Sequence, residues 1–382
     1  MNQPIAGEPA KRALIVGGSL GGLLTALALR TIGWCVDVFE RSPHALDSRG
    51  GGLVLQADVL RAFKFAGVRP AGMLGVASSD RIFLDQAGHV LQRGYQPQTQ
   101  TSWNMLYGVM RAALPAECIH AGQALERFEQ AGGQVRAHFA DGRVESGDLL
   151  VGADGPRSTV RAQLLPEVRP AYAGYVAWRG LVPELELDEA QRALLDGVFA
   201  FQQGPEHMLL EYLVPGEDGA TAPGRRRWNW VWYRKVDGAD LPAVLTDRAG
   251  AAHAFSLPPG ALPDARAAAL RRDAEAMLAP PFAALVRSTA EPFVQSILDL
   301  EVPRMVSGRA LLLGDAAFIA RPHTAGGVAK AAANALALAE ALRRPGATID
   351  DALRAWETAQ LRAGRELIEW GRQLGARIMG VP

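Results

Sequence analysis

The first residues with evident chemistry lie near the N-terminus, in the turn formed by residues 17–22, with the sequence GGSLGG. An apolar segment, residues 14–16, precedes this turn, and an apolar run, residues 23–29, follows it. A buried strand that ends in a glycine-rich turn and opens a helix presents unpaired backbone N–H groups at the positive end of the helix dipole. The segment therefore predicts a site for the pyrophosphate of a dinucleotide.

The turn departs from the G-x-G-x-x-G fingerprint at one position. In that fingerprint the first glycine makes the turn, the second lets the backbone approach the pyrophosphate, and the third lets helix and strand pack closely. Gly17 and Gly22 fill the outer positions, whereas Ser19 occupies the middle one and precedes Leu20. Because serine is small and its hydroxyl can donate to a phosphate oxygen, we expect the site to be kept with one side-chain contact added.

An acidic residue at a suitable distance supports the dinucleotide hypothesis. Glu40 ends the next expected strand, residues 35–39, about 20 residues beyond the turn, where an acid binds a ribose hydroxyl. Asp37 is the alternative, although it lies inside the strand. Because a carboxylate repels a 2′-phosphate, the site favours FAD or NAD. The competing interpretation is an ordinary strand–helix–strand unit with a tight turn.

Two later segments repeat the order of strand, turn and helix. The expected strand at residues 148–151 ends in the turn GADGPRS, and the strand at residues 310–313 ends in GDAA. An alanine-rich helix, residues 328–342, follows the second turn after a loop that contains Arg321, Pro322 and His323. Each junction is of the type that binds a nucleotide, so we expect all three to serve one ligand.

The composition indicates a soluble protein of the cytoplasm. The 382 residues suffice for two domains, and 40 basic residues balance 40 acidic ones, so neither nucleic acid nor a membrane surface is an expected partner. No apolar run reaches the ~18 residues of a membrane span, and the first ten residues lack the apolar segment of a signal peptide. Cys35 and Cys118 provide neither a disulfide framework nor metal-ligand spacing. We therefore expect no metal site.

Hydrophobic periodicity predicts the elements that position these turns. Helices are expected at residues 57–65, 103–114, 264–277 and 348–378. Asp264 and Thr348 are the expected N-caps of the last two, and the last helix is expected to brace the sheet. Strands and turns are expected at residues 81–91 (a hairpin), 124–128, 134–139 and 143–145.

A later region, from Tyr172 onward, is richer in aromatic strands. In residues 227–233 strict alternation places Trp228, Trp230 and Trp232 on one face of a strand. That face is expected either to pack against other elements or to line a pocket.

Taken together, the turns at residues 17–22, 152–155 and 314–315, with Glu40, resemble those of the class A flavoprotein aromatic hydroxylases over essentially the whole chain. This family comprises the para-hydroxybenzoate hydroxylase-like monooxygenases. The resemblance implies an α/β fold: a Rossmann-like FAD-binding domain of the glutathione reductase type, interleaved with an α+β substrate domain on a mainly antiparallel sheet, and a C-terminal helix. The implied FAD-binding domain comprises residues 1–75, 100–170 and 290–345, the substrate domain residues 76–99 and 171–289, and the C-terminal helix residues 346–382.

The resemblance also implies roles for individual residues. In that family the carboxylate equivalent to Asp315 binds a ribityl hydroxyl of FAD, and the turn equivalent to Asp154 and Gly155 lies near the pyrophosphate and is linked to the nicotinamide cofactor. The helix after Gly326 and Gly327 would direct its N-terminus at the flavin pyrimidine ring, where its dipole favours the anion of reduced flavin. The expected FAD contacts are Gly17, Ser19, Leu20, Gly22, Glu40, Arg41, Arg49, Arg111, Asp154, Gly155, Asp315, Ala325, Gly326 and Gly327.

Within the family, the chain resembles the 2,6-dihydroxypyridine 3-monooxygenase branch. The features that match are the GGSLGG turn, Arg321-Pro322-His323, and residues 172–180, YAGYVAWRG. Asn334 departs from the aspartate expected there. That departure concerns the cofactor side of the site.

The chemistry implied is hydroxylation of an electron-rich, already hydroxylated aromatic or N-heteroaromatic ring. NAD(P)H is the co-substrate that reduces FAD, and O₂ then adds to give a flavin C4a-hydroperoxide whose distal oxygen attacks the ring. Dry surroundings are needed because water promotes loss of peroxide. The expected partners are the ring substrate and O₂, and a homodimer stays open.

The residue that assists substrate deprotonation is left open among His323, Tyr212 and His207. His207 and Tyr212 lie on an expected strand, residues 206–214, that faces the pocket in this family. Strand alternation directs these two side chains to opposite faces unless a bulge intervenes. His323 lies in the loop beside the flavin and could bond substrate, although a lone histidine is more often structural.

Three other functions remain as alternatives. A flavin-dependent halogenase has a Trp-x-Trp signature similar to residues 228–230, but Val231 and Trp232 follow here in place of Ile-Pro, and Lys64 is a distant candidate for its lysine. A non-catalytic FAD-binding protein would show no substrate-stimulated NAD(P)H oxidation. A plain NAD dehydrogenase would be colourless after FAD reconstitution.

Overall fold

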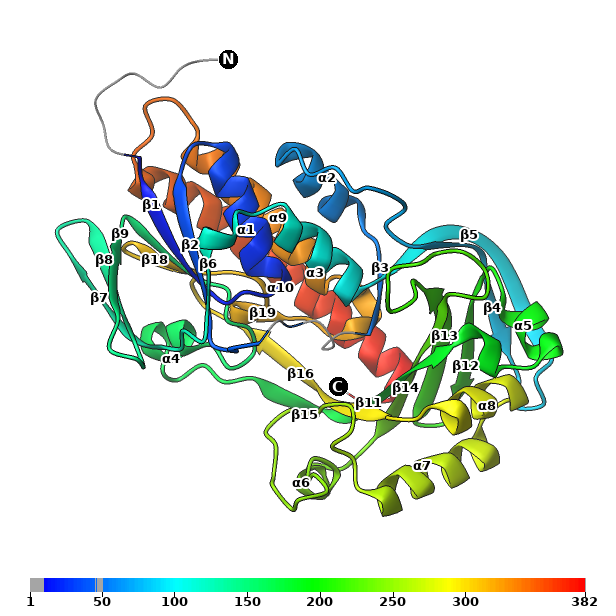
Figure 1. Cartoon of the computed structure of the whole chain (residues 1–382). Helices are drawn as coiled ribbons and strands as arrows, with labels where there is room; N and C mark the ends of the chain where they lie inside the picture. Colours follow the sequence, from blue (N-terminus) through cyan, green and yellow to red (C-terminus); the bar gives the residue numbers. More distant parts are fainter. Residues whose placement is uncertain (1–9, 45, 47–50, 382) are drawn as a thin grey trace.

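The apolar segment before the glycine turn forms the centre of a largely parallel sheet (Figure 1). The structure is a computed structural model and describes residues 10–44, 46 and 51–381. Strands pair in parallel throughout this sheet except at its edge, where β17 and β18 are antiparallel. In spatial order the strands are β17 (Val306–Ser307), β18 (Ala310–Leu312), β10 (Leu149–Gly152), β1 (Arg12–Val16), β2 (Cys35–Glu40) and β6 (Ile119–Ala121).

Helices and a small sheet cover this parallel sheet and complete one hydrophobic core. Because both faces are covered, the central strands β1, β10 and β18 are almost entirely apolar, as is usual for parallel sheets. The covering helices are α1 (Leu20–Thr31), α2 (Ala57–Phe65), α3 (Trp103–Ala112) and α9 (Gly327–Leu342). The small antiparallel sheet consists of β7 (Leu125–Ala131), β8 (Gln134–Phe139) and β9 (Val144–Gly147).

A second, larger sheet is mainly antiparallel, with one parallel pair, β12 and β4. In spatial order its strands are β15 (Ser256–Leu257), β16 (Phe293–Glu301), β11 (Ala171–Pro183), β14 (Arg227–Lys235), β13 (His207–Val214), β12 (Val198–Gly204), β4 (Val76–Leu84), β5 (Val90–Ser102) and β3 (Gly52–Val54), and β19 (Phe318–Ile319) pairs with β16. The two sheets and the covering helices form the α/β fold that the family resemblance implies.

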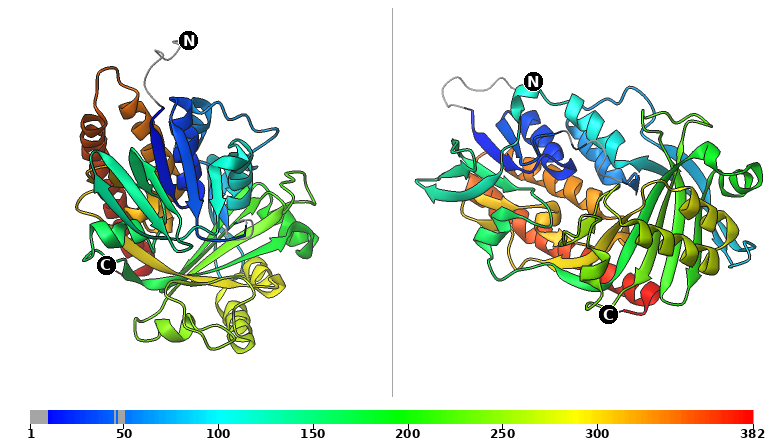
Figure 2. Two further views of the ribbon diagram at one scale, coloured as in Figure 1. Left: turned by 60° about the vertical axis from the view of Figure 1, so that its left-hand side comes forward. Right: turned by 60° about the horizontal axis from the view of Figure 1, so that its bottom comes forward.

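Different helices cover the two faces of the large sheet (Figure 2). On the outer face, α7 (Asp264–Met277) and α8 (Pro280–Ser288) pack on the tryptophans of β14. Towards the parallel sheet, α10 (Ile349–Met379) runs as one helix beneath α9 and reaches β13 and β14 (Figure 1). The remaining short elements are α4 (Thr159–Leu164), α5 (Glu189–Leu195), α6 (Leu241–Val244), η1 (Ala116–Cys118), η2 (Glu184–Glu186), η3 (Gly314–Ala316) and η4 (Pro322–Thr324).

Most expected elements occur within a few residues of their expected bounds, and the differences are informative. Thr348 is the N-cap of α10, where its side chain accepts a hydrogen bond from the Asp351 backbone, as expected. The expectation for Asp264 was wrong: Pro263 occupies the cap position and Asp264 is the first helical residue. A carboxylate in the first turn still interacts favourably with the helix dipole, so the sequence signal was real but displaced by one residue.

Sheet membership bears on the expected domain boundaries. Strands β3 and β16 hydrogen-bond into the large sheet, whereas residues 1–75 and 290–345 were assigned to the FAD-binding domain. We keep the division into two interleaved domains as a proposal, with these two strands moved to the substrate domain. Within residues 10–44, 46 and 51–381, no helix combines the length and apolarity needed to cross a membrane.

Candidate active site

A cavity of about 1470 Å³ is lined by residues from both sheets. At one end it reaches the turns that follow β1, β10 and β18, and at the other it reaches the side of the large sheet opposite the tryptophans. A cavity of this size is larger than the 300–1,000 Å³ of typical ligand pockets, so it has room for more than one small molecule.

The glycine turn forms part of the cavity and is sterically constrained. Gly17 has φ of +110°, and a Cβ there would lie 2.4 Å from the carbonyl oxygen of Ala153. A Cβ at Gly22 would lie 1.9 Å from the carbonyl oxygen of Gly17, so Gly22 permits helix–strand packing without itself lining the cavity. Ser19 is the N-cap of α1 and lines the cavity, and its side chain makes no capping hydrogen bond. The N-terminus of α1 is therefore directed at the cavity, and the Ser19 hydroxyl is available to a ligand.

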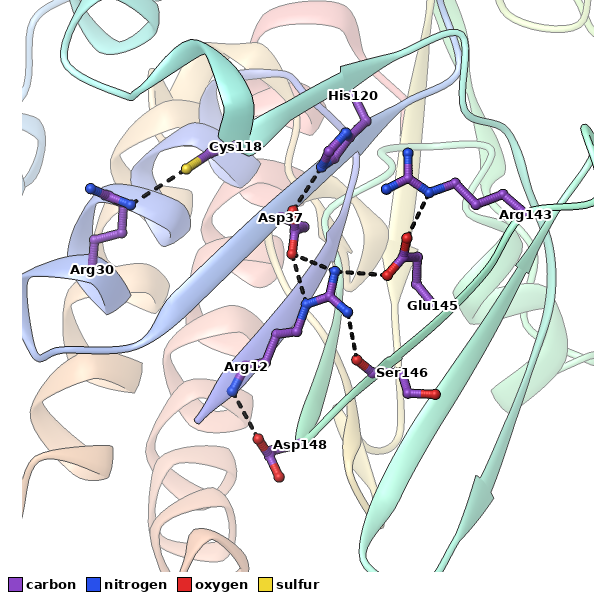
Figure 3. A network of polar contacts seen from close by, with 9 residues as sticks. All are labelled: Arg12, Arg30, Asp37, Cys118, His120, Arg143, Glu145, Ser146 and Asp148. Atoms are coloured by element: carbon purple, nitrogen blue, oxygen red, sulfur yellow. Dashed lines mark hydrogen bonds and ion pairs between the residues drawn. The ribbon is translucent and has the colours of Figure 1, made fainter. Parts of the chain in front are cut away.

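The two acids of β2 have different surroundings. Glu40 lines the cavity, and its carboxylate accepts hydrogen bonds from the backbone N–H of Gly18 at 2.8 Å and of Ser42 at 2.9 Å. Asp37, the alternative, is not among the cavity residues and instead joins a polar network between the parallel sheet and β9 (Figure 3). The choice between the two acids therefore falls on Glu40.

In that network Arg12 connects three strands (Figure 3). Its guanidinium lies 2.7 Å from Asp37 and 2.8 Å from Glu145, and His120 lies 2.7 Å from the other oxygen of Asp37. These side-chain contacts connect β1, β2, β6 and β9. Asp37 is therefore occupied by structural partners.

The turn after β10 combines a helix cap with an unsatisfied oxygen. One oxygen of Asp154 accepts from the backbone N–H of Thr159 at 2.7 Å and of Val160 at 3.2 Å, which caps α4. The other oxygen is buried and has no hydrogen-bond partner among the described residues. Burial raises the pKa of the Asp154 carboxyl. Asp154 and Gly155 both line the cavity.

The turn after β18 presents Asp315 to the cavity and fixes it from behind. Its side chain is 48% exposed, and Lys330 of α9, which is buried, lies 3.0 Å from its carboxylate and also donates to the carbonyl of Phe318. Asn334 accepts from the backbone N–H of Gly314 at 3.1 Å and donates to Gln360 of α10 at 2.8 Å. An aspartate could not donate that second bond, which gives the departure at Asn334 a structural reason.

The N-terminus of α9 also opens on the cavity. Ala325, with φ of +50°, precedes Gly326 and Gly327, and all three line the cavity. A non-glycine residue in the left-handed region is strained, and such strain often marks a functional site. No side chain caps this helix, so its first backbone N–H groups remain for a ligand.

The other expected FAD contacts divide into three groups. Leu20 and Arg41 line the cavity. Arg111 does not: it lies in the last turn of α3, outside the cavity residues, so the structure does not bring it to the site. Arg49 lies outside the described residues.

Tyr212 lines the far end of the cavity. It belongs to β13, the strand between β12 and β14 in the large sheet. Burial raises the pKa of its phenol, so the group is protonated at neutral pH. Its neighbour Asn229 accepts from the backbone N–H of Gly52 at 2.7 Å, and the Asn229 amide nitrogen has no partner among the described residues. Met208 and Leu210, two and four residues before Tyr212, line the same cavity.

His207 points the other way. Its Nδ1 accepts from Trp232 Nε1 at 3.2 Å, and it is not among the cavity residues. The alternation that directs His207 and Tyr212 to opposite faces is therefore observed, and β13 has no bulge at this point. His207 is not brought to the site, because its face belongs to the packed side of the sheet.

His323 lies in η4 and lines the cavity between the two ends. Its Nε2 is 2.9 Å from the hydroxyl of Tyr175, and its ring lies 4.4 Å from that of Tyr233. Burial lowers the pKa of His323 to about 4, so the ring is neutral at physiological pH.

Several cavity residues are not among the site residues expected from the sequence. Arg179 of β11 lies beside Tyr233, and Arg81 of β4 lies over the rings of Phe199 and Phe201 at 5.3 and 5.7 Å. Alternation along residues 172–180 could have placed Arg179 on the same face as Tyr175. No sequence signal indicated that the end of α10 lines the cavity as well as bracing the sheet, which it does through Trp370, Leu374, Arg377 and Ile378.

These residues suit FAD. Two uncapped helix N-termini and an acid at the end of β2 surround one end of the cavity, and the buried oxygen of Asp154 lacks a partner there. A side chain at Gly17 or Gly22 would clash with neighbouring backbone, so the turn that forms this end of the cavity requires glycine at both positions. A dinucleotide with a long flavin half fits a cavity that extends from this cradle to the large sheet.

Comparisons with known proteins agree with this site. A family model described as FAD binding domain-like matches residues 172–299. The chain is 33% identical over 369 residues to 2,6-dihydroxypyridine 3-monooxygenase of Paenarthrobacter nicotinovorans, covering 96% of this chain and 91% of that protein. It is 27% identical to 6-hydroxynicotinate 3-monooxygenase of Pseudomonas fluorescens, covering 88% of this chain and 83% of that one.

A solved structure leads to the same result. The 2,6-dihydroxypyridine-3-hydroxylase from Arthrobacter nicotinovorans superposes with a TM-score of 0.91 at 32% identity, over 98% of this chain and 94% of that chain. With the curated relative at 33% identity over nearly the whole length, this likeness shows common descent and not the fold alone. The chain therefore belongs to the class A flavoprotein hydroxylases, the FAD-dependent aromatic-ring monooxygenases, and FAD is its cofactor.

Proposed function

We propose that this enzyme hydroxylates an aromatic or N-heteroaromatic ring that already bears a hydroxyl group, with NAD(P)H and O₂ as co-substrates. One oxygen atom of O₂ enters the ring and the other leaves as water, while NAD(P)H supplies two electrons. Hydroxypyridines are the first substrate class to test, because two of the relatives described above are named for substrates of this kind.

The observation that supports this proposal most directly is the continuity of the cavity. The same cavity includes Glu40 and Asp315 at the nucleotide end and Tyr212, Arg179 and His323 at the end suited to a small ring. A bound cofactor and a ring substrate would therefore share one enclosed space.

The residues at the nucleotide end have distinct proposed roles. Glu40, oriented by two backbone donors, accepts from a ribose hydroxyl, and Asp315, held by Lys330, accepts from a ribityl hydroxyl. The N-terminus of α1, with Ser19, donates to the pyrophosphate, and Asp154 lies beside it. The N-terminus of α9 faces the flavin pyrimidine ring, where the helix dipole favours negative charge.

At the ring end, the proposed work is to bind, orient and polarise. When bound, FAD supplies the reduction by NAD(P)H and the activation of O₂. Tyr212 remains protonated and donates to a substrate oxygen, while the positive charge of Arg179 favours the deprotonated form of the substrate hydroxyl. Phe83, Phe199 and Phe201 exclude water from this end.

The decisive experiment is a substrate screen with the yellow, FAD-loaded protein. 2,6-Dihydroxypyridine, 6-hydroxynicotinate and salicylate are each tested for stimulated NAD(P)H oxidation, and the product is analysed by mass spectrometry under isotopically labelled O₂. We expect one labelled oxygen atom in the product of at least one ring. Stimulated oxidation that yields only hydrogen peroxide with every ring would contradict hydroxylation.

Paired variants separate cofactor binding from ring chemistry. Asp315→Asn should lower FAD retention, measured by flavin fluorescence after gel filtration, because it removes a charged acceptor. Tyr212→Phe should retain FAD and lose coupling between NAD(P)H use and product. Equal loss of FAD in both variants would contradict the division of roles.

The location and assembly of the enzyme are part of the same proposal. A cytoplasmic location is supported by Cys35 and Cys118, which are both free thiols, since a reducing compartment maintains that state. A homodimer is tested by sizing of the FAD-loaded protein in solution.

A further inference from the structure

His323 is held by a chain of polar contacts that extends away from the cavity. Its Nε2 lies 2.9 Å from the Tyr175 hydroxyl, and the two rings are stacked with an interplanar angle of 18°. Tyr175 is fully buried on β11, on the side of the sheet that faces the cavity. The other ring nitrogen, Nδ1, is buried and has no hydrogen-bond partner among the described residues.

Behind Tyr175 lies a buried ion pair. Arg321 donates from Nη2 to Asp299 at 2.8 Å and from Nε at 3.1 Å, and its guanidinium carbon lies 5.8 Å from the centre of the Tyr175 ring. Its guanidinium fits against α10 because that helix has glycine at position 375, where a Cβ would lie 2.3 Å from Arg321 Nη1. Arg321 is therefore fixed in one place by Asp299 on one side and by α10 on the other.

The direction of each hydrogen bond follows from which groups can only donate. A guanidinium has no acceptor, so Arg321 cannot receive the proton of the Tyr175 hydroxyl. The Tyr175 hydroxyl keeps one proton, because burial raises the pKa of that phenol well above its usual range. The acceptor within reach of that proton is His323 Nε2. Nε2 must then be unprotonated, and the proton of the neutral imidazole must reside on Nδ1.

The opposite assignment leaves two buried groups unsatisfied. If Nε2 carried the proton and donated to Tyr175, the phenolic proton would have no acceptor among the described residues, and Nδ1 would be an unpaired acceptor. Each buried polar group without a partner is costly, and the proposed assignment leaves one such group among the described residues, Nδ1–H, where the opposite one leaves two. The low pKa of His323, about 4 because of burial, excludes the form in which both nitrogens are protonated at neutral pH.

We propose that Tyr175 is a positioning residue that fixes His323 as the Nδ1–H tautomer, so that Nδ1–H donates to an acceptor oxygen of the ring substrate, either a carbonyl or a deprotonated hydroxyl. The substrate part of this inference rests on the proposed function. The tautomer part does not, because it follows from protein groups alone.

The tautomer is measured directly by long-range ¹H–¹⁵N NMR of the FAD-loaded protein labelled at histidine. The chain contains seven histidines, and a His323→Gln variant identifies the signals of His323. We expect an unprotonated Nε2 and a protonated Nδ1 in the wild-type enzyme. A wild-type spectrum in which the His323 proton lies on Nε2 would overturn the proposal.

Two tyrosine variants test whether the Tyr175 hydroxyl determines the tautomer of His323. Tyr175→Phe removes the proton donor, so we expect His323 to shift towards the Nε2–H tautomer. Tyr172→Phe is the matched control, because it removes a hydroxyl from the same strand that donates to the carbonyl of Val236, and it should leave the His323 signals unchanged. Retention of the Nδ1–H tautomer in Tyr175→Phe would overturn the positioning role.

The source of the acceptor oxygen is tested by adding components in turn. With 6-hydroxynicotinate or 2,6-dihydroxypyridine as the probe, we expect the Nδ1–H signal to shift on ring binding to the FAD-loaded protein. A shift on FAD loading with no further change on ring addition would overturn the substrate assignment and transfer the contact to the flavin.

Steady-state kinetics then distinguish a role of Tyr175 in positioning His323 from a general disturbance of the fold. Tyr175→Phe should raise KM for the active ring by about tenfold, the size of one lost hydrogen bond, with less effect on kcat and with FAD affinity unchanged. A fall in kcat alone would overturn the binding role. If no ring is hydroxylated, the proposed function fails while the tautomer result stands by itself, so the two failures are distinguishable.

Discussion

The two faces of the large sheet differ in how their polar groups are satisfied. On the outer face, Trp228, Trp230 and Trp232 are fully buried, and each indole N–H has an acceptor: the Glu184 carbonyl, the Thr289 hydroxyl and His207 Nδ1. On the cavity side, polar atoms of Asn229, Arg179 and His323 are buried without a partner among the described residues.

This difference separates a packed surface from a binding surface within the same strands. Buried polar groups are nearly always paired in a folded protein, because an unpaired group loses its hydration without compensation. A face with satisfied groups therefore stabilises the fold. A face with several unsatisfied groups beside a large cavity is completed by a ligand.

Glu211 is the exception on the packed face. Its side chain is fully buried, and neither carboxylate oxygen has a hydrogen-bond partner among the described residues. Burial raises the pKa of this carboxyl well above its ordinary value of 4.5. Glu211 lies outside the cavity residues, so its lack of partners is a cost to stability and no evidence of a second site.

The largest expected effect is on the packed face. Trp230→Ala should lower the free energy of unfolding by about 3–5 kcal/mol, because it removes a large buried side chain and leaves a cavity. Denaturant titration measures this. The control, Trp370→Ala, changes a cavity-lining tryptophan that is 49% exposed and should cost less than about 1 kcal/mol. Equal costs would remove the distinction between the faces.

The next effect is on the cavity side. Arg179→Met should lower kcat/KM for the active ring by about a hundredfold, close to 2.7 kcal/mol, while the free energy of unfolding changes by less than about 1 kcal/mol. Arg234→Met is the matched control, because Arg234 lies in the same sheet but over Trp232 on the packed face. Loss of activity in both variants would contradict a specific role for Arg179.

Glu211→Met should stabilise the protein by about 1–3 kcal/mol at pH 8, because it replaces an unpaired buried acid by an apolar side chain. Since the folded-state pKa is raised, folding takes up a proton above pH 4.5, and the wild-type protein loses stability as the pH rises from there. The variant should lose that part of the pH dependence. Unfolding curves at pH 5 and pH 8 provide the comparison, and parallel changes in both proteins would count against it.

The smallest effect tests the two faces of one strand. His207→Gln should leave kcat within about twofold and lower the free energy of unfolding by about 1 kcal/mol, because it disturbs one hydrogen bond to Trp232. Tyr212→Phe should do the reverse, with kcat lowered and stability nearly unchanged. A large loss of kcat in His207→Gln would return that residue to the candidate site.

The nucleotide end of the cavity could largely be predicted from sequence, because its determinants are local. The turn at residues 17–22 depends on small residues at fixed spacing, and Glu40 lies at the end of the following strand. The position of Glu40 at the end of its strand already favoured it over Asp37, which lies inside the strand. Only the structure shows the contacts that occupy Asp37, with Arg12 and His120, since His120 is distant in sequence.

The ring end was harder to predict, because its determinants are not local in sequence. Alternation separated His207 from Tyr212 but gave no information on which face meets a cavity. Arg111 was expected near FAD on family resemblance, and the structure leaves it outside the cavity residues. The contribution of α10 to the cavity depends on where one long helix ends in space, which periodicity does not specify.

By itself, the sequence determined the periodic and local features of this protein: the buried strands, the three turns that follow them, and the alternation that places Trp228, Trp230 and Trp232 on one face of a strand. These depend on backbone geometry over a few residues. Only the tertiary structure decided which face of the large sheet is open, and that Asp299, Arg321 and Tyr175 meet behind His323. Such choices depend on packing between segments that are not neighbours in sequence, from 22 residues apart for Asp299 and Arg321 to 148 for Tyr175 and His323, where side-chain volume and hydrogen-bond satisfaction act together.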